Sequence, residues 1–226
     1  MKLVITGVPG SGKGTQAKLI SQELHIPHIS TGDMFRRAIA MGTELGQLAE
    51  KLITKGHFIP DEVTLGVVKE RLAEPDCAHG YILDGFPRTL AQAKAAIKSL
   101  EPDSVIVLEV PQTAAVERIV QRLSCPQCGG VFNPRLHEVG WGQRCPHCKS
   151  TLAKRDDDTE AIALERMDVY NRLTKPAVEF MKQAWPTIVV DASRAIGEVF
   201  GDIMSSLSPN GVEPRVESGA TGTARD

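Results

Sequence analysis

Four of the five cysteines in this chain lie in one short stretch, as two pairs with the spacing Cys-x-x-Cys. Cys125 and Cys128 form the first pair, and Cys145 and Cys148 form the second after sixteen intervening residues. Four thiolates with this spacing are typical of a tetrahedral zinc site, although such a set also takes iron or cobalt. Because four protein ligands leave no open coordination position, we expect the metal to hold a small segment together rather than to catalyse a reaction.

Two other functions of paired cysteines fit the intervening residues less well. A nucleic-acid-binding ribbon is expected to be basic, with aromatic side chains interleaved for stacking. Here Arg135 and Arg144 are offset by Glu138, and the aromatic residues are Phe132 and Trp141. A thioredoxin-like redox centre is typical of one Cys-x-x-Cys pair near a βαβ pattern, not of two pairs in a ribbon.

A glycine-rich stretch near the N-terminus has the composition of a phosphate-binding loop. The sequence GVPGSGKGT spans Gly7–Thr15, between an apolar run and a segment with helical periodicity. Glycines let the backbone N–H groups turn inward, the helix N-terminus adds its dipole, and Lys13 adds a positive charge. Position 14 is glycine, so the hydroxyl that holds Mg²⁺ in the general pattern falls on Thr15 instead.

A second polar stretch, YILDGFPR, follows another apolar run. Asp84 ends this run and is placed to hold Mg²⁺, directly or through waters, beside the glycine-rich loop. Arg88 follows in a loop at the edge of the sheet where ligands bind in such folds. The further arginines that stand near predicted loops are Arg36, Arg118, Arg122, Arg155 and Arg166. Arginines in this number favour phosphoryl transfer to an acceptor that is itself a phosphate, because repulsion between two anions is then the main obstacle.

These residues must be positioned by alternating strands and helices. Apolar and β-branched runs predict strands at 2–6, 28–30, 81–84, 104–110 and 187–191. Helical periodicity predicts helices at 13–24, 33–40, 43–54, 61–73, 89–100, 113–123, 158–184 (bent or broken near Pro176) and 196–207. Runs too apolar to face water predict a parallel sheet covered on both faces. Residues 208–226 are rich in Gly, Ser, Pro and Thr, which predicts a disordered tail.

The length and net charge of the chain limit the kinds of partner and function that we expect. A chain of 226 residues can build one core with a small inserted subdomain. The formal net charge of −2 does not favour nucleic acid or an anionic membrane surface as a partner. There is no run of eighteen apolar residues, and the first apolar stretch is too short for a signal peptide. We therefore expect a cytoplasmic protein with no membrane and no nucleic-acid partner.

Four motifs, in order along the chain, resemble adenylate kinase: GVPGSGKGT, ISTGDMFR, LDGFPRTLAQA and RDDDTEAIALERM. The resemblance covers roughly residues 1–207, and LDGFPRT is its most specific part. It implies the P-loop nucleoside monophosphate kinase fold, a five-stranded parallel sheet flanked by helices. The core would comprise 1–29, 60–122 and 159–207, with a subdomain for the nucleoside monophosphate at 30–59 and a zinc-ribbon lid at 123–158.

The resemblance also implies roles for individual residues. ATP would be bound by Gly10, Ser11, Gly12, Lys13, Gly14, Thr15, Arg118, Arg122, Val131, Phe132 and Arg194. AMP would be bound by Thr31, Arg36, His57, Phe58, Ile59, Gly85, Phe86, Pro87, Arg88, Gln92, Arg155 and Arg166. The transfer would depend on Lys13, Asp84, Arg88, Arg122, Arg155 and Arg166. Asp157 and Asp158 match an acidic pair that helps to position the arginines around the phosphates.

The implied reaction is MgATP plus AMP giving two ADP, carried out by a monomer with a structural metal, zinc or else iron or cobalt. Phe132 stands where many members of the family have Tyr, and Arg194 stands where some have Lys. Thr31 together with Gln92 favours AMP as the acceptor, since the related UMP/CMP kinases carry Ala at the position of Thr31. The alternatives are a kinase for UMP or CMP, and a P-loop protein that binds nucleic acid through its ribbon.

Overall fold

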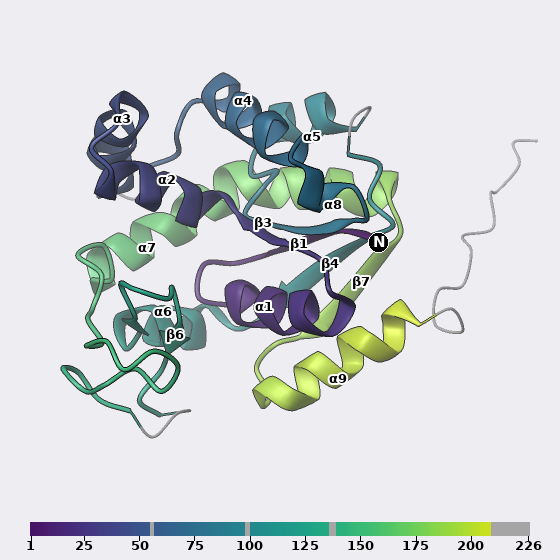
Figure 1. Cartoon of the computed structure of the whole chain (residues 1–226). Helices are drawn as coiled ribbons and strands as arrows, with labels where there is room; N and C mark the ends of the chain where they lie inside the picture. The colour runs from purple at the N-terminus through teal and green to yellow at the C-terminus, as the bar shows by residue number, and fades with distance from the viewer. Residues whose placement is uncertain (55–56, 98–99, 136–138, 209–226) are drawn as a thin grey trace, which may run out of the picture.

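The computed structural model describes residues 1–54, 57–97, 100–135 and 139–208. It has one central sheet with helices on both faces (Figure 1). The disordered tail was predicted for 208–226, of which all but Ser208 lies outside the described residues. No helix in the described ranges is both long and apolar enough to cross a membrane.

The central sheet contains five parallel strands, as the sequence predicts. In spatial order they are β2 (His28–Ser30), β3 (Tyr81–Asp84), β1 (Lys2–Gly7), β4 (Ser104–Glu109) and β7 (Thr187–Asp191). Strand β1 pairs with β3 and β4 and occupies the centre. Ser30 and Ile5 are the register partners of Asp84 from either side. The parallel arrangement therefore brings the glycine-rich loop after β1 and the loops after β2 and β3 to one edge of the sheet.

Successive side chains along the strands point to opposite faces of the sheet, which divides the core into two layers. Val4 and Leu83 face helices on one side of the sheet, whereas Leu3, Ile5 and Ile82 face helices on the other side. All five side chains are fully buried. Such strands, apolar on both faces, are what a parallel sheet covered by helices requires.

The helices cover these two faces and surround the loops at the edge of the sheet. They are α1 (Lys13–Leu24), α2 (Thr31–Ala40), α3 (Glu44–Ile53), α4 (Asp61–Leu72), α5 (Leu90–Ala96), α6 (Gln112–Val120), α7 (Glu160–Val169), α8 (Lys175–Ala184) and α9 (Ile196–Leu207), with a short 3₁₀ turn η1 (Pro75–Cys77). Helices α1 and α9 pack on one face of the sheet, and α4, α5 and α8 pack on the other.

Six of the eight predicted helices have different limits in the structure. Helices α3, α4 and α5 are shorter than predicted, and the other three differ in more informative ways. Helix α2 begins at Thr31 rather than at residue 33, because the Ser30 hydroxyl caps it by accepting a hydrogen bond from the Asp33 N–H. The predicted helix 158–184 is divided into α7 and α8 by a π-helical segment, η2 (Tyr170–Thr174), just before Pro176. Helix α6 ends at Val120, so the prediction that it reaches Leu123 is wrong.

Leu123 instead begins a small antiparallel pair outside the main sheet. Strand β5 (Leu123–Ser124) pairs with β6 (Val131–Phe132), and Ser124 also bridges to Ala153. A small apolar cluster lies beneath them, formed by Leu123, Cys125, Phe132, Cys145 and Leu152. This compact unit, which we call the lid, contains the four cysteines and is compatible with the zinc-ribbon lid that the family resemblance implies.

Candidate functional site

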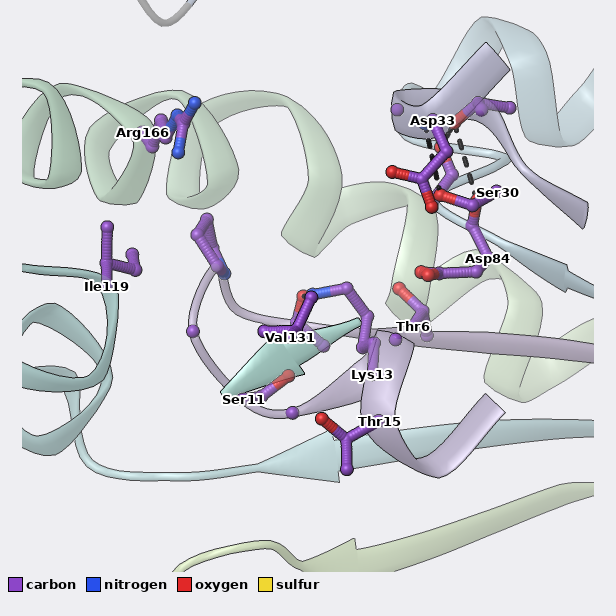
Figure 2. A pocket seen from close by; sticks show the side chains of 18 of the residues that line it. Thr6, Ser11, Lys13, Thr15, Ser30, Asp33, Asp84, Ile119, Val131 and Arg166 are labelled. Atoms are coloured by element: carbon purple, nitrogen blue, oxygen red, sulfur yellow. Dashed lines mark hydrogen bonds between the residues drawn. The ribbon is translucent and has the colours of Figure 1, made fainter. Parts of the chain in front are cut away.

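One cavity of about 340 Å³ lies at the edge of the sheet where the strands end. Its lining combines the glycine-rich loop, the start of α2, the loop after β3, strand β6 and helix α7. Every residue predicted to bind a nucleotide lines it except Phe86, whose side chain is buried in the core cluster with Val4 and Leu83. Residues from widely separated parts of the sequence thus converge on one space, part of which Figure 2 shows.

The glycine-rich loop has backbone conformations that require glycine. Gly10 and Gly12 both have positive φ angles, of 82° and 92°. A side chain at Gly10 would also overlap the backbone carbonyl of Ala115 in α6. Gly12 caps α1, so the loop leads directly into the N-terminus of a twelve-residue helix. This is the arrangement in which backbone N–H groups and a helix dipole can bind a phosphate.

Lys13 is held by the loop that it follows. Its Nζ donates hydrogen bonds to the carbonyl oxygens of Gly7 and Val8, each at 2.9 Å. The pKa of Lys13 is lowered to about 8. Burial is the main cause, Asp84 acts in the opposite direction, and the nearby Arg88 and Arg122 add to the lowering. The ammonium group is therefore partly desolvated and close to other cations, a position in which an anion would stabilise its charge.

Asp84 lies at the end of β3, almost fully buried, beside the glycine-rich loop. Its Oδ2 is 3.3 Å from His28 Nε2 on the neighbouring strand β2. The same oxygen would lie 3.6 Å from a Cβ placed at Gly14. Carboxylate and loop are therefore adjacent, as expected for a group that holds Mg²⁺ beside bound phosphates, and Thr15 lines the same cavity.

Thr31 and Arg88 meet at one carbonyl group in the loop after β3. The Gly85 oxygen accepts hydrogen bonds from Thr31 Oγ1 at 2.9 Å and from Arg88 Nε at 2.6 Å. The Arg88 guanidinium also lies over the ring of Phe58, 5.5 Å from its centroid. Burial lowers the pKa of Arg88, which nevertheless stays charged at neutral pH. The AMP candidates on α2, the 57–59 segment and this loop are thus in mutual contact.

Arg36 on α2 forms an ion pair with Asp33 one helical turn earlier, Nη2 to Oδ1 at 2.7 Å. Both residues line the cavity, and Asp33 lies beside Ser30 in Figure 2. The pKa of Asp33 is lowered, although burial acts against this, because Arg36 pairs with it and Arg155 is also close. Asp33 was not predicted as a site residue, although its i, i+3 spacing to Arg36 could have indicated the pair.

Two further arginines share an acidic pair at the base of the lid. Arg122 Nε donates to Asp158 Oδ2 at 2.7 Å, and Arg166 pairs with Asp157 and lies 3.6 Å from Asp158 Oδ1. Both carboxylates are buried. Burial is the main cause that lowers the pKa of Arg166, followed by the charge of Arg122. Positive charges held close together in a desolvated space form a strong anion site.

Arg155 is the arginine of the lid that lines the cavity. Its Nε donates to Ser124 Oγ at 2.9 Å, so the two chain segments that enter and leave the lid are linked. Burial lowers the pKa of Arg155, and the proximity of Arg122 and Arg36 lowers it further. Arg155 therefore stands between the arginines near the P-loop and those on the α2 side of the cavity.

Two more arginines occupy the opposite end of the cavity, near α9. Arg118 on α6 donates from Nη1 to the Ala192 carbonyl at 2.8 Å and from Nη2 to the Ser193 carbonyl at 3.3 Å. Arg194 pairs with Asp202 of α9. The lid residues Val131 and Phe132 line the same cavity. These apolar surfaces and the planar guanidinium of Arg118, which lines the same cavity, are suited to contact an aromatic base.

The four cysteines of the lid form one cluster separate from the residues that line the cavity. Their sulfur atoms all lie within 4.8 Å of one another. The Cys125–Cys148 and Cys128–Cys145 sulfur distances are 3.3 Å and 3.6 Å. A tetrahedral zinc–thiolate site with bonds of about 2.3 Å places its sulfurs about 3.8 Å apart. The cluster therefore fits a tetrahedral metal ion with four thiolate ligands.

Other cavity residues gave no signal in the sequence. Gln16 on α1 donates from Nε2 to the Ile196 carbonyl at 2.9 Å, while its buried Oε1 has no hydrogen-bond partner among the described residues. Asn133 follows β6, and Tyr170 begins the π-helical segment. Their roles depend on contacts between distant segments, which neither composition nor spacing could indicate.

A glycine-rich phosphate loop at the edge of a five-stranded parallel sheet, facing a buried aspartate and a ring of arginines, defines a P-loop nucleoside monophosphate kinase. The family model for adenylate kinase matches residues 5–185. The chain is 49% identical to an adenylate kinase of Moorella thermoacetica, over 88% of this chain and 94% of that protein. It is 45% identical to an adenylate kinase of Clostridium botulinum (strain Eklund 17B), over 92% of this chain and 99% of that protein. The chain belongs to the adenylate kinase family.

Proposed function

We propose that this protein reversibly transfers a phosphoryl group from MgATP to AMP, giving two ADP. The observation that carries this proposal is the single cavity shared by the P-loop, the AMP candidates and the arginine cluster. Membership of the adenylate kinase family supports the same reaction.

ATP is proposed to lie along the P-loop side of the cavity. Its phosphates would be bound by backbone N–H groups of residues 10–15 and by Lys13, which would exchange the Gly7 and Val8 carbonyls for a phosphate oxygen. Its base would lie between Arg118 and the lid residues Val131 and Phe132, with Arg194 near its ribose and phosphates.

AMP is proposed to lie on the α2 side. Its phosphate would meet Arg36, which pairs with Asp33, and Arg88, which the Phe58 ring and the Gly85 carbonyl hold in place. Its base would lie against the backbone of 57–59 and the amide of Gln92. The backbone of Phe86 and Pro87 would form one wall of the AMP site.

The chemistry proposed for the protein groups is electrostatic. The attacking AMP oxygen already carries a charge, so transfer requires alignment of the two nucleotides and neutralisation of the transferred group. Arg122, Arg155, Arg166 and Lys13 all line the one cavity, and we place them where the two proposed nucleotide sites would meet. Bound Mg²⁺ would add further positive charge, and Asp84 would hold it directly or through waters.

The remaining assignments concern organisation. We propose a core of 1–29, 60–122 and 159–207, an AMP-binding subdomain at 30–59 and a lid at 123–158. The ion in the four-cysteine cluster is proposed to be zinc, with iron or cobalt as alternatives, and its role is structural because four thiolates leave no open position. The protein is further proposed to act as a monomer in the cytoplasm, without a nucleic-acid or membrane partner.

A coupled assay that follows ADP formation from ATP with AMP, UMP or CMP tests the reaction. AMP is expected to be the preferred acceptor. Arg155→Ala should lower kcat by a factor of about 10² to 10³, as removal of one transition-state contact does in other enzymes. Arg135→Ala is the matched control, because Arg135 is an exposed lid arginine that pairs with Glu117 and does not line the cavity. No ADP formed from ATP and AMP would overturn the proposal.

A further inference from the structure

Asp61 lies at the start of α4, behind the amide of Gln92 and outside the cavity lining. Its Oδ1 accepts a hydrogen bond from Gln92 Nε2 at 2.7 Å, and its Oδ2 accepts one from Thr89 Oγ1 at 2.8 Å. Thr89 in turn caps α5 by accepting a hydrogen bond from the Gln92 N–H at 3.1 Å. One carboxylate thus fixes both the helix that carries Gln92 and the side chain of Gln92.

The partners of Gln92 determine which way its amide points. The backbone N–H of Arg88 donates to Oε1 at 2.7 Å, so the oxygen must face that group. The Asp61 carboxylate accepts hydrogen bonds, so the Nε2 amino group must face the carboxylate. Gln92 is 2% exposed, which leaves its amide few alternative partners. One hydrogen on Nε2 and one lone pair on Oε1 remain without a bond to Asp61 or Arg88. Because Gln92 lines the cavity, these two groups are available to a ligand there.

In this fixed orientation, the Nε2 donor and the Oε1 acceptor of Gln92 are complementary to a base that carries an amino group next to an accepting ring nitrogen. Adenine presents its N6 amino group next to a ring nitrogen that accepts, whereas 6-oxopurines present an oxygen at that position. We propose that Asp61 is a positioning residue that selects 6-amino over 6-oxo purine monophosphates by fixing the orientation of the Gln92 amide. This inference rests on the proposed function, with AMP as the acceptor.

The test compares AMP with IMP, which differ in the group at position 6. Asp61→Ala removes the acceptor for Nε2 and is expected to raise KM for AMP about tenfold and to lower the AMP-over-IMP ratio of kcat/KM about tenfold. KM for ATP should stay within twofold. Glu62→Ala is the matched control, since it removes an exposed carboxylate from the same first turn of α4. Asp61→Asn should restore most of the selectivity, because its amide oxygen can still accept from Nε2.

A double-mutant cycle tests whether Asp61 acts through Gln92. If it does, Asp61→Ala should have little further effect on selectivity when Gln92→Ala is already present, whereas independent effects would multiply. Should Asp61→Ala not fold at the assay temperature, Asp61→Ser replaces it, because its side chain is too short to reach Nε2 but keeps a polar group in the first turn of α4.

The outcomes separate the two proposals. A wild-type protein that forms no ADP from ATP and AMP overturns the proposed function. An active wild type in which the Asp61→Ala and Glu62→Ala variants have the same AMP-over-IMP ratio overturns the role of Asp61 alone. Multiplicative effects of Asp61→Ala and Gln92→Ala in the cycle also overturn the role of Asp61. So does an Asp61→Asn variant that has lost as much selectivity for AMP over IMP as Asp61→Ala.

Discussion

Arg122 and Asp158 form a two-point ion pair at the place where the chain enters and leaves the lid. Arg122 Nε donates to Oδ2 at 2.7 Å, and its Nη2 donates to Oδ1. The Asp158 side chain is completely buried, while Arg122 lines the cavity. The carboxylate therefore sets the orientation of a cation that we assign to the phosphates.

Removal of Asp158 should affect both activity and stability. Asp158→Ala leaves Arg122 without its carboxylate, and breaking a buried pair in this way typically costs about 3–5 kcal/mol. We expect a clear drop in melting temperature and a fall in kcat of at least tenfold, measured by thermal unfolding and the coupled assay. Because ATP phosphates would supply the missing negative charge, saturating ATP should raise the melting temperature of this variant more than that of the wild type.

Asp156 provides the control for that experiment. It lies two residues earlier, is exposed, and belongs to neither of the ion pairs at the base of the lid. Asp156→Ala should leave both the melting temperature and kcat close to the wild type. Equal effects of the two substitutions would show that net charge, rather than the orientation of Arg122, is what matters.

Gly85 is expected to be intolerant of any side chain. Its φ angle is +78°, and a Cβ would lie 2.5 Å from Arg88 Nη2 and 2.9 Å from Thr31 Oγ1. Gly85→Ala should therefore displace both groups and raise KM for AMP, with a smaller change in KM for ATP. Gly66→Ala is a suitable control, because a Cβ at that position meets no atom within 4 Å. Equal rises in both KM values would indicate general disruption instead.

Elements governed by local pattern could be predicted from the sequence. The strands Tyr81–Asp84 and Thr187–Asp191 and the helices Lys13–Leu24 and Ile196–Leu207 have the predicted limits, since apolar periodicity marks them directly. Leu123 was placed in a helix because it continues an apolar period, but pairing with Phe132 across the lid makes it part of a strand. That choice depends on a tertiary contact that a local pattern does not contain.

The candidate site could be predicted for a different reason. The P-loop and the four cysteines have spacings set by chemistry, whereas the assembly of Arg36, Arg88 and Arg166 around one cavity followed from the family resemblance. Asp61 could not be predicted as a site residue because its role depends on a hydrogen bond to Gln92, which is 31 residues away in the chain. Buried hydrogen bonds between distant polar residues leave no periodic trace in a single sequence.

Nucleotide binding should take up protons at alkaline pH. The pKa of Lys13 is about 8 in the free protein, and phosphates bound beside it should raise this pKa. Binding of ATP at pH 8.5 should therefore involve proton uptake, and its affinity should fall as the pH rises through 8 and above. Calorimetry in buffers with different ionisation enthalpies measures the uptake. Below pH 7 the effect of Lys13 should vanish, since this residue is then protonated in both states.

Lys13→Arg is the matched variant for this linkage. A guanidinium keeps its proton throughout this pH range, so the variant should bind ATP without the uptake seen at pH 8.5. Undiminished uptake in Lys13→Arg would assign the proton to another group and would remove Lys13 from the explanation.

The four-cysteine cluster should control the stability of the lid rather than the chemistry of transfer. Cys125 and Cys145 belong both to the four-cysteine cluster and to the small apolar core of the lid. A core of this size is insufficient to hold such a unit, whereas a structural zinc ion contributes roughly 10–16 kcal/mol of binding free energy. Cys145→Ser should therefore lose the metal, measured by elemental analysis, and lower the melting temperature.

The kinetic effect of metal loss should be unequal for the two nucleotides. Val131 and Phe132 are assigned to ATP, so a loosened lid should raise KM for ATP more than KM for AMP, and the loss of ordered Arg155 should lower kcat. Cys77→Ser is the control, because Cys77 is buried outside the cluster and should not change the metal content. A metal-free Cys145→Ser variant with wild-type activity and an unchanged melting temperature would contradict the structural role, whichever of zinc, iron or cobalt the wild type contains.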